Sequence, residues 1–139
     1  MKTLYLFTLT LSGVLTQVSD FLVKYPYNPI CAVRGFSVSI PCSYYYPTSN
    51  PRIQVTQKLW CSMNSNTERC TDPPYVYNSS SITTSDFEYA GDNKSNCTLL
   101  IHNVQFSYSG EYRFRFITDK AGGRWTGVPG AILQVAGKF

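Results

Sequence analysis

Ser-Gly-Glu-Tyr-Arg-Phe-Arg-Phe, at residues 109–116, is the stretch of sequence that decides the fold. From Tyr112 onward, aromatic residues alternate with arginines, and a period of two is typical of a β-strand with one buried face. We therefore expect the three aromatic residues to face inward and the two arginines, Arg113 and Arg115, to face outward. A glycine two residues before an inward tyrosine, here Gly110, is the tyrosine-corner arrangement, in which the phenol bonds to upstream backbone.

Short strand patterns continue outward from this stretch in both directions. Apolar residues alternate with small polar ones in residues 36–42 and 97–101, and the run 131–135 closes the pattern. Clusters of Gly, Pro, Asn and Ser separate these runs, as in an all-β sandwich. Pro41 lacks an N–H group, which predicts a bulge or a sheet edge at that point. The residues expected on buried faces are Phe36, Val38, Ile40, Cys42, Cys97, Leu99 and Ile101.

Two further features indicate an immunoglobulin variable-type domain. Trp60 follows Cys42 by eighteen residues, the spacing of the tryptophan buried on strand C of such domains. The segment Gly-Val-Pro-Gly-Ala-Ile-Leu-Gln-Val, residues 127–135, resembles their glycine-bulged final strand. The predicted fold class is therefore all-β, a two-sheet Greek-key sandwich of the immunoglobulin V type.

Two positions depart from the usual variable-domain pattern. Phe114 stands where the second cysteine of the bridge between the two sheets is expected, so that bridge cannot form. Tyr108 stands where an Asp is usual, and no Arg opens the strand around Phe87. We expect the ion pair that normally joins these two places to be lost at both ends.

The first residues have the pattern of an export signal. Lys2 supplies a positive start, and residues 4–15 form an apolar run that is too short to span a bilayer. The alternative is a buried N-terminal strand or helix. We expect a signal peptide at 1–19, cleaved between Thr16 and Asp20, and one immunoglobulin-like domain at 20–139. The mature chain would be secreted or lie on the extracellular side of the plasma membrane, by itself or as the first module of a longer receptor.

The composition of the chain argues against several classes of function. The net charge is +4 without a cluster of Lys and Arg, which argues against nucleic acid as a partner. Eleven Tyr, eight Phe and two Trp suit strands and a surface that faces glycan or protein. The one histidine, His102, has no nucleophile or carboxylate at a meaningful spacing, and no metal or phosphate motif is present. We therefore expect neither an enzyme nor a cofactor or metal site.

Five cysteines can pair in several ways, and their positions on the predicted strands distinguish these pairings. Cys42 and Cys97 fall on strands that neighbour each other in one sheet, about 4.8 Å apart, which is within disulfide reach. Cys61 and Cys70 would form a local bridge between strands C and C′. That arrangement resembles the Lys-x-Trp-Cys motif of polymeric-immunoglobulin-receptor-like domains. Cys31 remains, either as a buried free thiol or as half of an interdomain or intermolecular bridge.

The sequence resembles the N-terminal variable domain of sialoadhesin and its Siglec relatives from Phe21 to Val135. Asn-Cys-Thr-Leu-Leu-Ile-His-Asn-Val at 96–104, the stretch at 109–116, and a Trp ten residues after its second Arg carry the resemblance. Three unusual features coincide: a cysteine pair within one sheet, no cysteine on strand F, and an Arg just past that missing cysteine. In this family an early lone cysteine bridges to the following domain, which would give Cys31 its partner.

The resemblance implies a sialic-acid site. Arg115 would grip the sialate carboxylate, Trp125 would pack on the glycerol tail, and Phe21 would lie against the N-acetyl methyl group, with Phe21 the weakest match. A planar guanidinium binds a carboxylate with two parallel hydrogen bonds, which Lys cannot copy. The alternative is that Arg115 is a solvated strand charge and Trp125 an aromatic that packs on the sheet.

Two functions therefore remain open at this point. One is a recognition domain for sialylated glycans in cell adhesion or immune signalling, centred on Arg115. The other is a receptor or adhesion domain that binds a protein or lipid through its loops or front sheet, with Arg113 and Arg115 merely solvating the sheet. Sialidase-sensitive binding would distinguish the first from the second.

Three Asn-x-Ser/Thr acceptors suit an exported chain: Asn78-Ser-Ser, Asn93-Lys-Ser and Asn96-Cys-Thr. We expect all three to be exposed on loops or strand ends. Asn96 is the strongest of them because its Asn-Cys-Thr recurs in relatives of the family.

Overall fold

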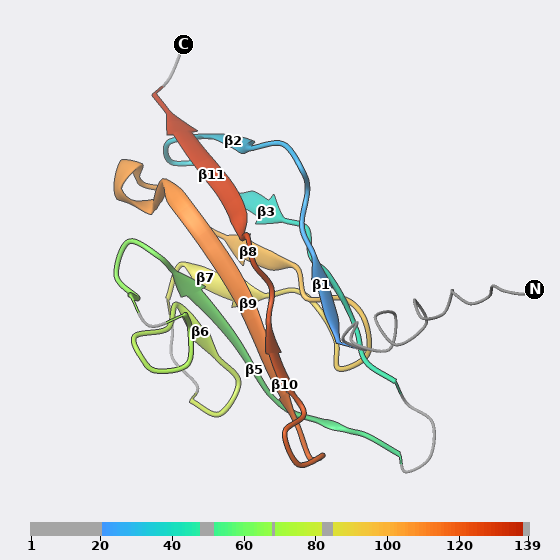
Figure 1. Ribbon diagram of the computed structural model, residues 1–139. Coiled ribbons are helices and arrows are strands. Elements are labelled where there is room, and N and C mark those ends of the chain that lie inside the picture. The colour runs from blue at the N-terminus through green and yellow to red at the C-terminus, as the bar shows by residue number, and fades with distance from the viewer. Residues whose placement is uncertain (1–20, 48–51, 68, 82–84, 138–139) are drawn as a thin grey trace, which may run out of the picture.

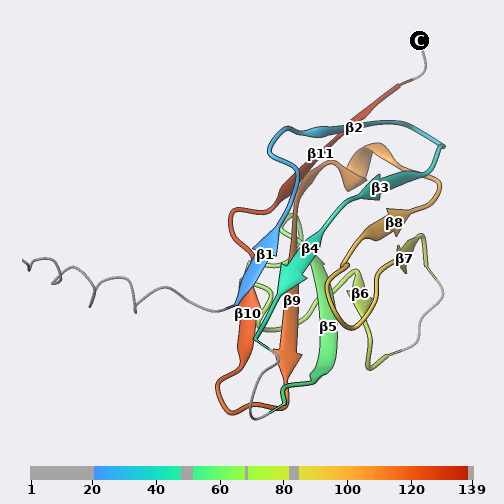
Figure 2. The same ribbon diagram turned by 90° about the vertical axis from the view of Figure 1, so that its right-hand side faces the viewer.

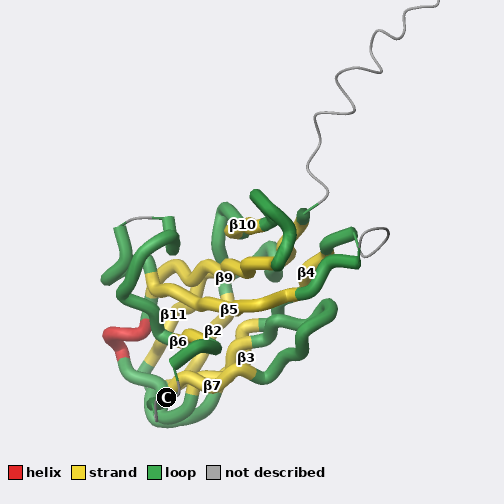
Figure 3. Tube along the Cα trace, turned by 90° about the horizontal axis from the view of Figure 1, so that it is seen from below, coloured by secondary structure: helices red, strands yellow, loops and turns green. Residues whose placement is uncertain are grey.

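Two layers of β-strands pack face to face (Figure 3), and the buried apolar side chains form one cluster between them. The computed structural model describes residues 21–47, 52–67, 69–81 and 85–137. The predicted signal peptide at 1–19 lies outside the described residues. Strands make up the regular structure of the described part, except for one turn of 3-10 helix, η1 (Phe106–Tyr108). The all-β sandwich expected from the sequence is confirmed.

The front sheet carries the long central strand and both halves of the final strand (Figure 1). Its strand order is β2-β11-β9-β5-β6, and β10 pairs with β9 beyond the end of β11. Only β2 and β11 run parallel; the other ladders of this sheet are antiparallel. The bounds are β2 (Ile30–Val33), β5 (Val55–Ser62), β6 (Tyr77–Asn78), β9 (Gly110–Thr118), β10 (Arg124–Thr126) and β11 (Ala131–Ala136).

The back sheet is made of shorter strands (Figure 2). Its central group has the order β3-β8-β7, and a separate pair joins β1 to β4. The bounds are β1 (Leu22–Lys24), β3 (Val38–Ile40), β4 (Ser43–Tyr45), β7 (Phe87–Tyr89) and β8 (Leu99–Ile101). The break between β3 and β4 falls at Pro41 and Cys42, because Pro41 cannot donate to the ladder, as the sequence predicts.

The alternation along β9 builds the core. Its three inward aromatic residues are buried, whereas the arginines between them are half-exposed. Trp60 packs against Phe114 with ring centroids 5.5 Å apart, and its Nε1 donates to the Cys97 carbonyl at 2.9 Å. One expectation was wrong: Phe36 is 61% exposed. Strand β3 begins only at Val38, so Phe36 lies outside the alternating pattern that would have turned it inward.

The Cys42–Cys97 bridge lies within the back sheet, as predicted. The two Cα atoms are 4.8 Å apart, and the Cys97 N–H donates to the Cys42 carbonyl at 2.9 Å. Phe114 fills the core position where a bridge between the sheets would otherwise stand. Cys31, on β2, is a free and exposed thiol, which excludes the buried-thiol alternative and leaves the bridge to another domain or molecule as a prediction.

The tyrosine corner is present at the start of β9. Tyr112 Oη donates to the Tyr108 carbonyl at 2.6 Å. Gly110 has a φ of +140°, which residues with a side chain rarely adopt. The connection expected to be lost nearby is replaced: Tyr108 Oη donates to Asp86 Oδ2 at 2.6 Å. A neutral phenol and a carboxylate thus join the two places that an ion pair joins in other variable domains.

Replacing Tyr112 with phenylalanine should lower the free energy of unfolding by about 1 kcal/mol. The change keeps the buried ring and removes the hydroxyl that ties the corner to the Tyr108 carbonyl. Guanidinium denaturation measures the effect. Tyr27→Phe is the control because the side chain of Tyr27 is fully exposed; equal midpoints for the two variants would contradict the role of the corner.

Candidate functional site

The final strand of the chain runs along β9 in two halves, β10 and β11. The first half, β10, places side chains beside Arg115. In the β9–β10 ladder, Arg124 stands opposite Ile117 and Thr126 stands opposite Arg115. Directly opposed residues share one face of a sheet. Arg115, Arg124 and Thr126 therefore lie on the outer face of the front sheet, away from the core.

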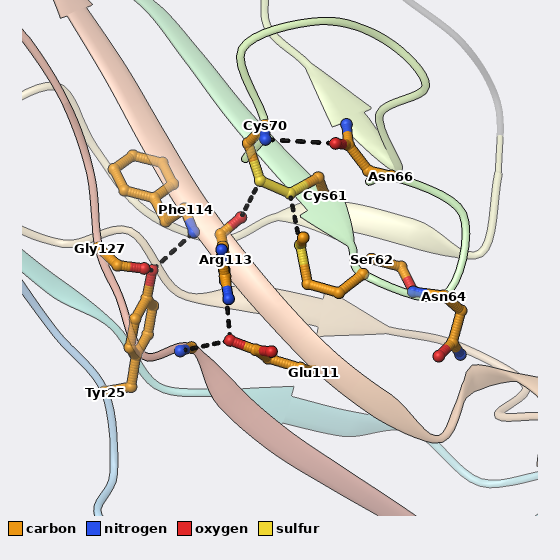
Figure 4. A network of polar contacts seen from close by, with 12 residues as sticks. Tyr25, Cys61, Ser62, Asn64, Asn66, Cys70, Glu111, Arg113, Phe114 and Gly127 are labelled. Atoms are coloured by element: carbon orange, nitrogen blue, oxygen red, sulfur yellow. Dashed lines mark hydrogen bonds and ion pairs between the residues drawn. A yellow bond between two sulfur atoms is a disulfide. The ribbon is translucent and has the colours of Figure 1, made fainter. Parts of the chain in front are cut away.

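Tyr25 fixes the position of β10 against β9 (Figure 4). Its hydroxyl accepts from the Phe114 N–H at 2.7 Å and donates to the Gly127 carbonyl at 3.0 Å. Gly127 is needed at this place, because a Cβ atom there would come within 2.7 Å of the Tyr25 hydroxyl oxygen. The hydroxyl thus bridges β9 and the end of β10, and it sets where Arg124 and Thr126 stand relative to Arg115.

An open hollow of about 550 Å³ lies beside these strands. We call it the arginine hollow because four arginines border it. Two come from the outer face of β9, one from β10, and one from the segment between β5 and β6. Its residues are Arg69, Thr71, Arg113, Arg115, Arg124, Trp125, Thr126 and Val128.

Arg115 keeps its charge available in the hollow. Its Nη1 donates to Thr126 Oγ1 at 2.8 Å, and among the described residues it forms no ion pair with a carboxylate. Burial lowers the pKa of Arg115; Tyr75 opposes that shift, and the nearby charge of Arg124 adds to it. An arginine stays protonated regardless. The guanidinium is therefore a half-buried cation, oriented by one hydroxyl.

Arg113 differs from Arg115 in having a carboxylate partner, although the two arginines are only two residues apart on the same face of β9. Its Nε is 2.8 Å from Glu111 Oε2, which also accepts from the Gly130 N–H at 2.8 Å (Figure 4). Burial would raise the pKa of Glu111, but the hydrogen bonds from Arg113 and Gly130 outweigh it and hold that pKa below its usual range. The charge of Arg113 is thus compensated within the chain.

The structure brings together two of the three residues predicted for the site. Trp125 borders the arginine hollow and is 36% exposed, although it pairs with the inward-facing Phe116 on the adjacent strand. Phe21 stacks on Phe116 at 5.6 Å, with the ring planes 11° apart. It thus packs against the core of the sandwich and does not border the hollow with Arg115.

The Cys61–Cys70 bridge is present, but it does not join two strands. Cys61 lies on β5, whereas Cys70 lies in the segment that precedes β6, with a φ of +64°. The expected link between strands C and C′ is therefore corrected to a link between a strand and a loop. Cys70 Sγ lies 3.9 Å from the Arg113 carbonyl oxygen, so the bridge holds this segment against the outer face of the front sheet (Figure 4).

A buried asparagine organises the same segment. Asn66 is 1% exposed, and its amide donates to the carbonyls of Asp72 and Pro74 at 2.7 and 3.0 Å. Its Oδ1 accepts from the Cys70 N–H at 3.2 Å. Nothing in the strand pattern reveals that this segment reaches the site, so sequence reasoning missed Arg69 and Thr71. The Cys61/Cys70 pair was the one available signal.

The predicted glycosylation acceptors differ in accessibility. Asn93 and Asn96 are exposed, next to the start of β8. Asn78 is half-buried on β6, where its Oδ1 accepts from the Gln57 amide at 3.0 Å and from the Ser80 N–H at 2.9 Å. Asn78 is therefore less exposed than predicted, because β6 is paired with β5 along its length.

We expect N-glycans on the chain when a glycosylating host produces it, with Asn96 the main acceptor and Asn78 the weakest. Treatment with an N-glycosidase should reduce the mass, and Asn96→Gln should shrink that reduction more than Asn78→Gln does. An unchanged mass after glycosidase treatment would contradict this prediction and weaken the case for export.

The fold also gives His102 neighbours that the sequence did not predict. Its Nε2 is 2.8 Å from Glu88 Oε1, and its Nδ1 is 3.3 Å from Ser37 Oγ. These residues come from three adjacent places in the back sheet. The side chains of His102 and Glu88 are 43% and 59% exposed, so water surrounds the pair. It is a surface hydrogen-bond chain without an enclosed site for chemistry.

In the part of the chain that the structure describes, no three His, Cys, Asp or Glu side chains gather as metal ligands would. None of the helical structure at residues 21–47, 52–67, 69–81 and 85–137 is long and apolar enough to cross a membrane.

The sandwich and its open, charged surface site define a recognition domain of the immunoglobulin type. The profile of the immunoglobulin V-set domain matches residues 26–129, and the chain belongs to that family, whose domains are typically extracellular and non-enzymatic. No curated protein sequence matches the chain.

Solved structures share the fold at low sequence identity. Murine CRIg is similar with a TM-score of 0.58 and 13% identity, covering 87% of this chain and 100% of that one. The Ig1 domain of mouse SynCAM 2 has a TM-score of 0.57 and 13% identity, covering 85% and 98%. Dpr1 IG1 bound to DIP-eta IG1 gives 0.55 and 14%, covering 82% and 95%.

Proposed function

We propose that this V-set domain is an extracellular recognition module that binds sialylated glycans through Arg115. One observation carries the proposal. The Arg115 guanidinium lies on the outer face of the front sheet, oriented by Thr126, with no carboxylate partner among the described residues. A cation that is half-buried and uncompensated is suited to an anionic ligand.

The chemistry of sialic acid matches this site. Its carboxylate can accept two parallel hydrogen bonds from a guanidinium. The hydrogen bond from Nη1 to Thr126 uses one donor and leaves others for the ligand. Trp125, at the border of the same hollow, offers an aromatic surface to the apolar part of the sugar. The open hollow encloses little of a ligand, so single-site affinity should be low and avidity on cell surfaces important.

The expected location fits such a ligand. A signal peptide at 1–19 would export the chain to the compartment where sialylated glycans are displayed. Exposed acceptors at Asn93 and Asn96 suit the same compartment. From outside the cell, the domain would contact glycans of neighbouring cells, in adhesion or immune signalling.

Binding to cells before and after sialidase treatment tests the proposal. The domain, presented as a multivalent reagent, should bind untreated cells and lose most of that binding once sialic acid is removed. Free sialyllactose should compete at millimolar concentration, which is the range of a weak, open site. Binding that survives complete desialylation would contradict the proposal.

The second candidate is a protein ligand on the same face. Val128 is 60% exposed, and it borders the arginine hollow together with Trp125. Exposed aromatic residues next to arginines are typical of protein-binding surfaces. Dpr1 IG1, a similar structure, is described as bound to DIP-eta IG1. This candidate predicts binding that is insensitive to sialidase and sensitive to Val128→Asp.

A further inference from the structure

The arginine hollow holds more positive charge than one carboxylate needs. Of its four arginines, only Arg113 forms an ion pair with a residue that the structure describes, namely Glu111. Arg69, Arg115 and Arg124 form none with any residue that the structure describes. A single sialate carboxylate would compensate one of these three charges, so two would remain uncompensated in the hollow.

Two of these charges repel each other. Arg115 and Arg124 lie on the same face of adjacent strands, because Arg115 pairs with Thr126, two residues beyond Arg124. The charge of Arg124 also lowers the pKa of Arg115, after the larger effect of burial. Bringing like charges together costs free energy, and a bound anion relieves that cost.

The third charge is held there by the fold. Arg69 is adjacent to Cys70, whose bridge to Cys61 fastens the segment to β5. The Cys70 N–H is held by the buried side chain of Asn66, and Cys70 Sγ lies 3.9 Å from the Arg113 carbonyl oxygen. Arg69 therefore reaches the hollow from a covalently fastened turn, which reduces the entropy lost when it contacts a ligand.

We propose that the arginine hollow takes a ligand with two anionic groups, in which Arg115 holds a sialate carboxylate and Arg69 with Arg124 holds a second acidic group. The inference rests on the proposed function and specifies its ligand class. A second sialic acid or a sulfate ester on the glycan supplies the same chemistry, a fixed negative charge with several acceptor oxygens. The volume of about 550 Å³ has room for more than one sugar residue.

Three soluble probes test the inference in calorimetric titrations of the intact domain at fixed ionic strength. They are sialyllactose, a disialyl lactose, and sialyllactose with one sulfate ester. We expect at least one doubly charged probe to bind about tenfold more tightly than sialyllactose, the gain of one charge-assisted contact. The probe that binds more tightly than sialyllactose identifies the chemical group that supplies the second charge. Equal affinity for all three would overturn the inference.

Single substitutions separate this inference from the proposed function. Arg69→Gln and Arg124→Gln should each remove most of the preference for the doubly charged probe, and each should weaken the binding of that probe more than the binding of sialyllactose. Arg52→Gln, at an exposed arginine that does not border the arginine hollow, is the control for net charge and should keep the preference. If Arg52→Gln lowers the preference as much as Arg69→Gln, the effect is general electrostatics and the inference fails.

Arg115→Gln should weaken every probe. If it changes none of them, the proposed function fails, whatever the other variants show. If it weakens all of them while Arg69→Gln and Arg124→Gln leave the preference intact, only the second anion position is refuted. The Cys61→Ala/Cys70→Ala double variant should resemble Arg69→Gln, because it releases the turn; a retained preference in a folded double variant would show that the bridge does not position Arg69.

Discussion

Arg115→Ala should weaken the binding of sialyllactose by about tenfold or more. The substitution removes a guanidinium that Thr126 orients and that pairs with no carboxylate among the described residues. A charge-assisted hydrogen bond contributes roughly 1.5–3 kcal/mol, and each 1.4 kcal/mol is a factor of ten in affinity. Titration calorimetry, or competition against a multivalent sialoside, measures the loss.

Two variants make the prediction specific. Arg115→Lys keeps the charge but not the planar fork, so it should not restore the affinity. Arg113→Ala should do much less, because the charge of Arg113 is already compensated by Glu111 at 2.8 Å. Equal losses for Arg113→Ala and Arg115→Ala would refute the sialoside site and favour the protein-ligand alternative.

Removing the Cys42–Cys97 bridge should cost about 4 kcal/mol of stability, a large share for a domain of this size. The two cysteines are 55 residues apart, and the entropy that a bridge takes from the unfolded chain grows with the length of the closed loop. The bridge lies in the core and is backed by a backbone hydrogen bond between the same two residues. Guanidinium unfolding of Cys42→Ala/Cys97→Ala measures the loss.

The second bridge is the matched control. Cys61 and Cys70 are also buried, but they are only 9 residues apart, so the same relation gives about 3 kcal/mol for Cys61→Ala/Cys70→Ala. The loss from Cys42→Ala/Cys97→Ala should therefore be the larger of the two, and only the loss of Cys61–Cys70 should alter the arginine hollow. A larger destabilisation from the local bridge would contradict the loop-length argument.

The sequence by itself determined the sandwich and its cross-links. Alternation along residues 112–116 placed the aromatic residues in the core, because a strand with one buried face must alternate. The spacing from Cys42 to Trp60 and the glycine before Tyr112 identified the variable-type architecture. Within that architecture, neighbouring strands set the Cys42–Cys97 pair. These features depend on local periodicity and on strand order, which sequence patterns encode.

The tertiary structure decided which charges are available at the surface. Arg113 and Arg115 both face outward in the sequence pattern, yet among the described residues only Arg113 pairs with a carboxylate. Arg69 reaches the site because a cross-linked loop folds back onto β9, and Phe21 packs against the core instead of bordering the hollow. The contacts of Arg69 and Phe21 join residues far apart in the sequence, whereas Glu111 and Arg113 are two residues apart on the outer face of one strand. These contacts follow from strand register, from the path of a loop and from competition for one apolar space, and no local pattern specifies these.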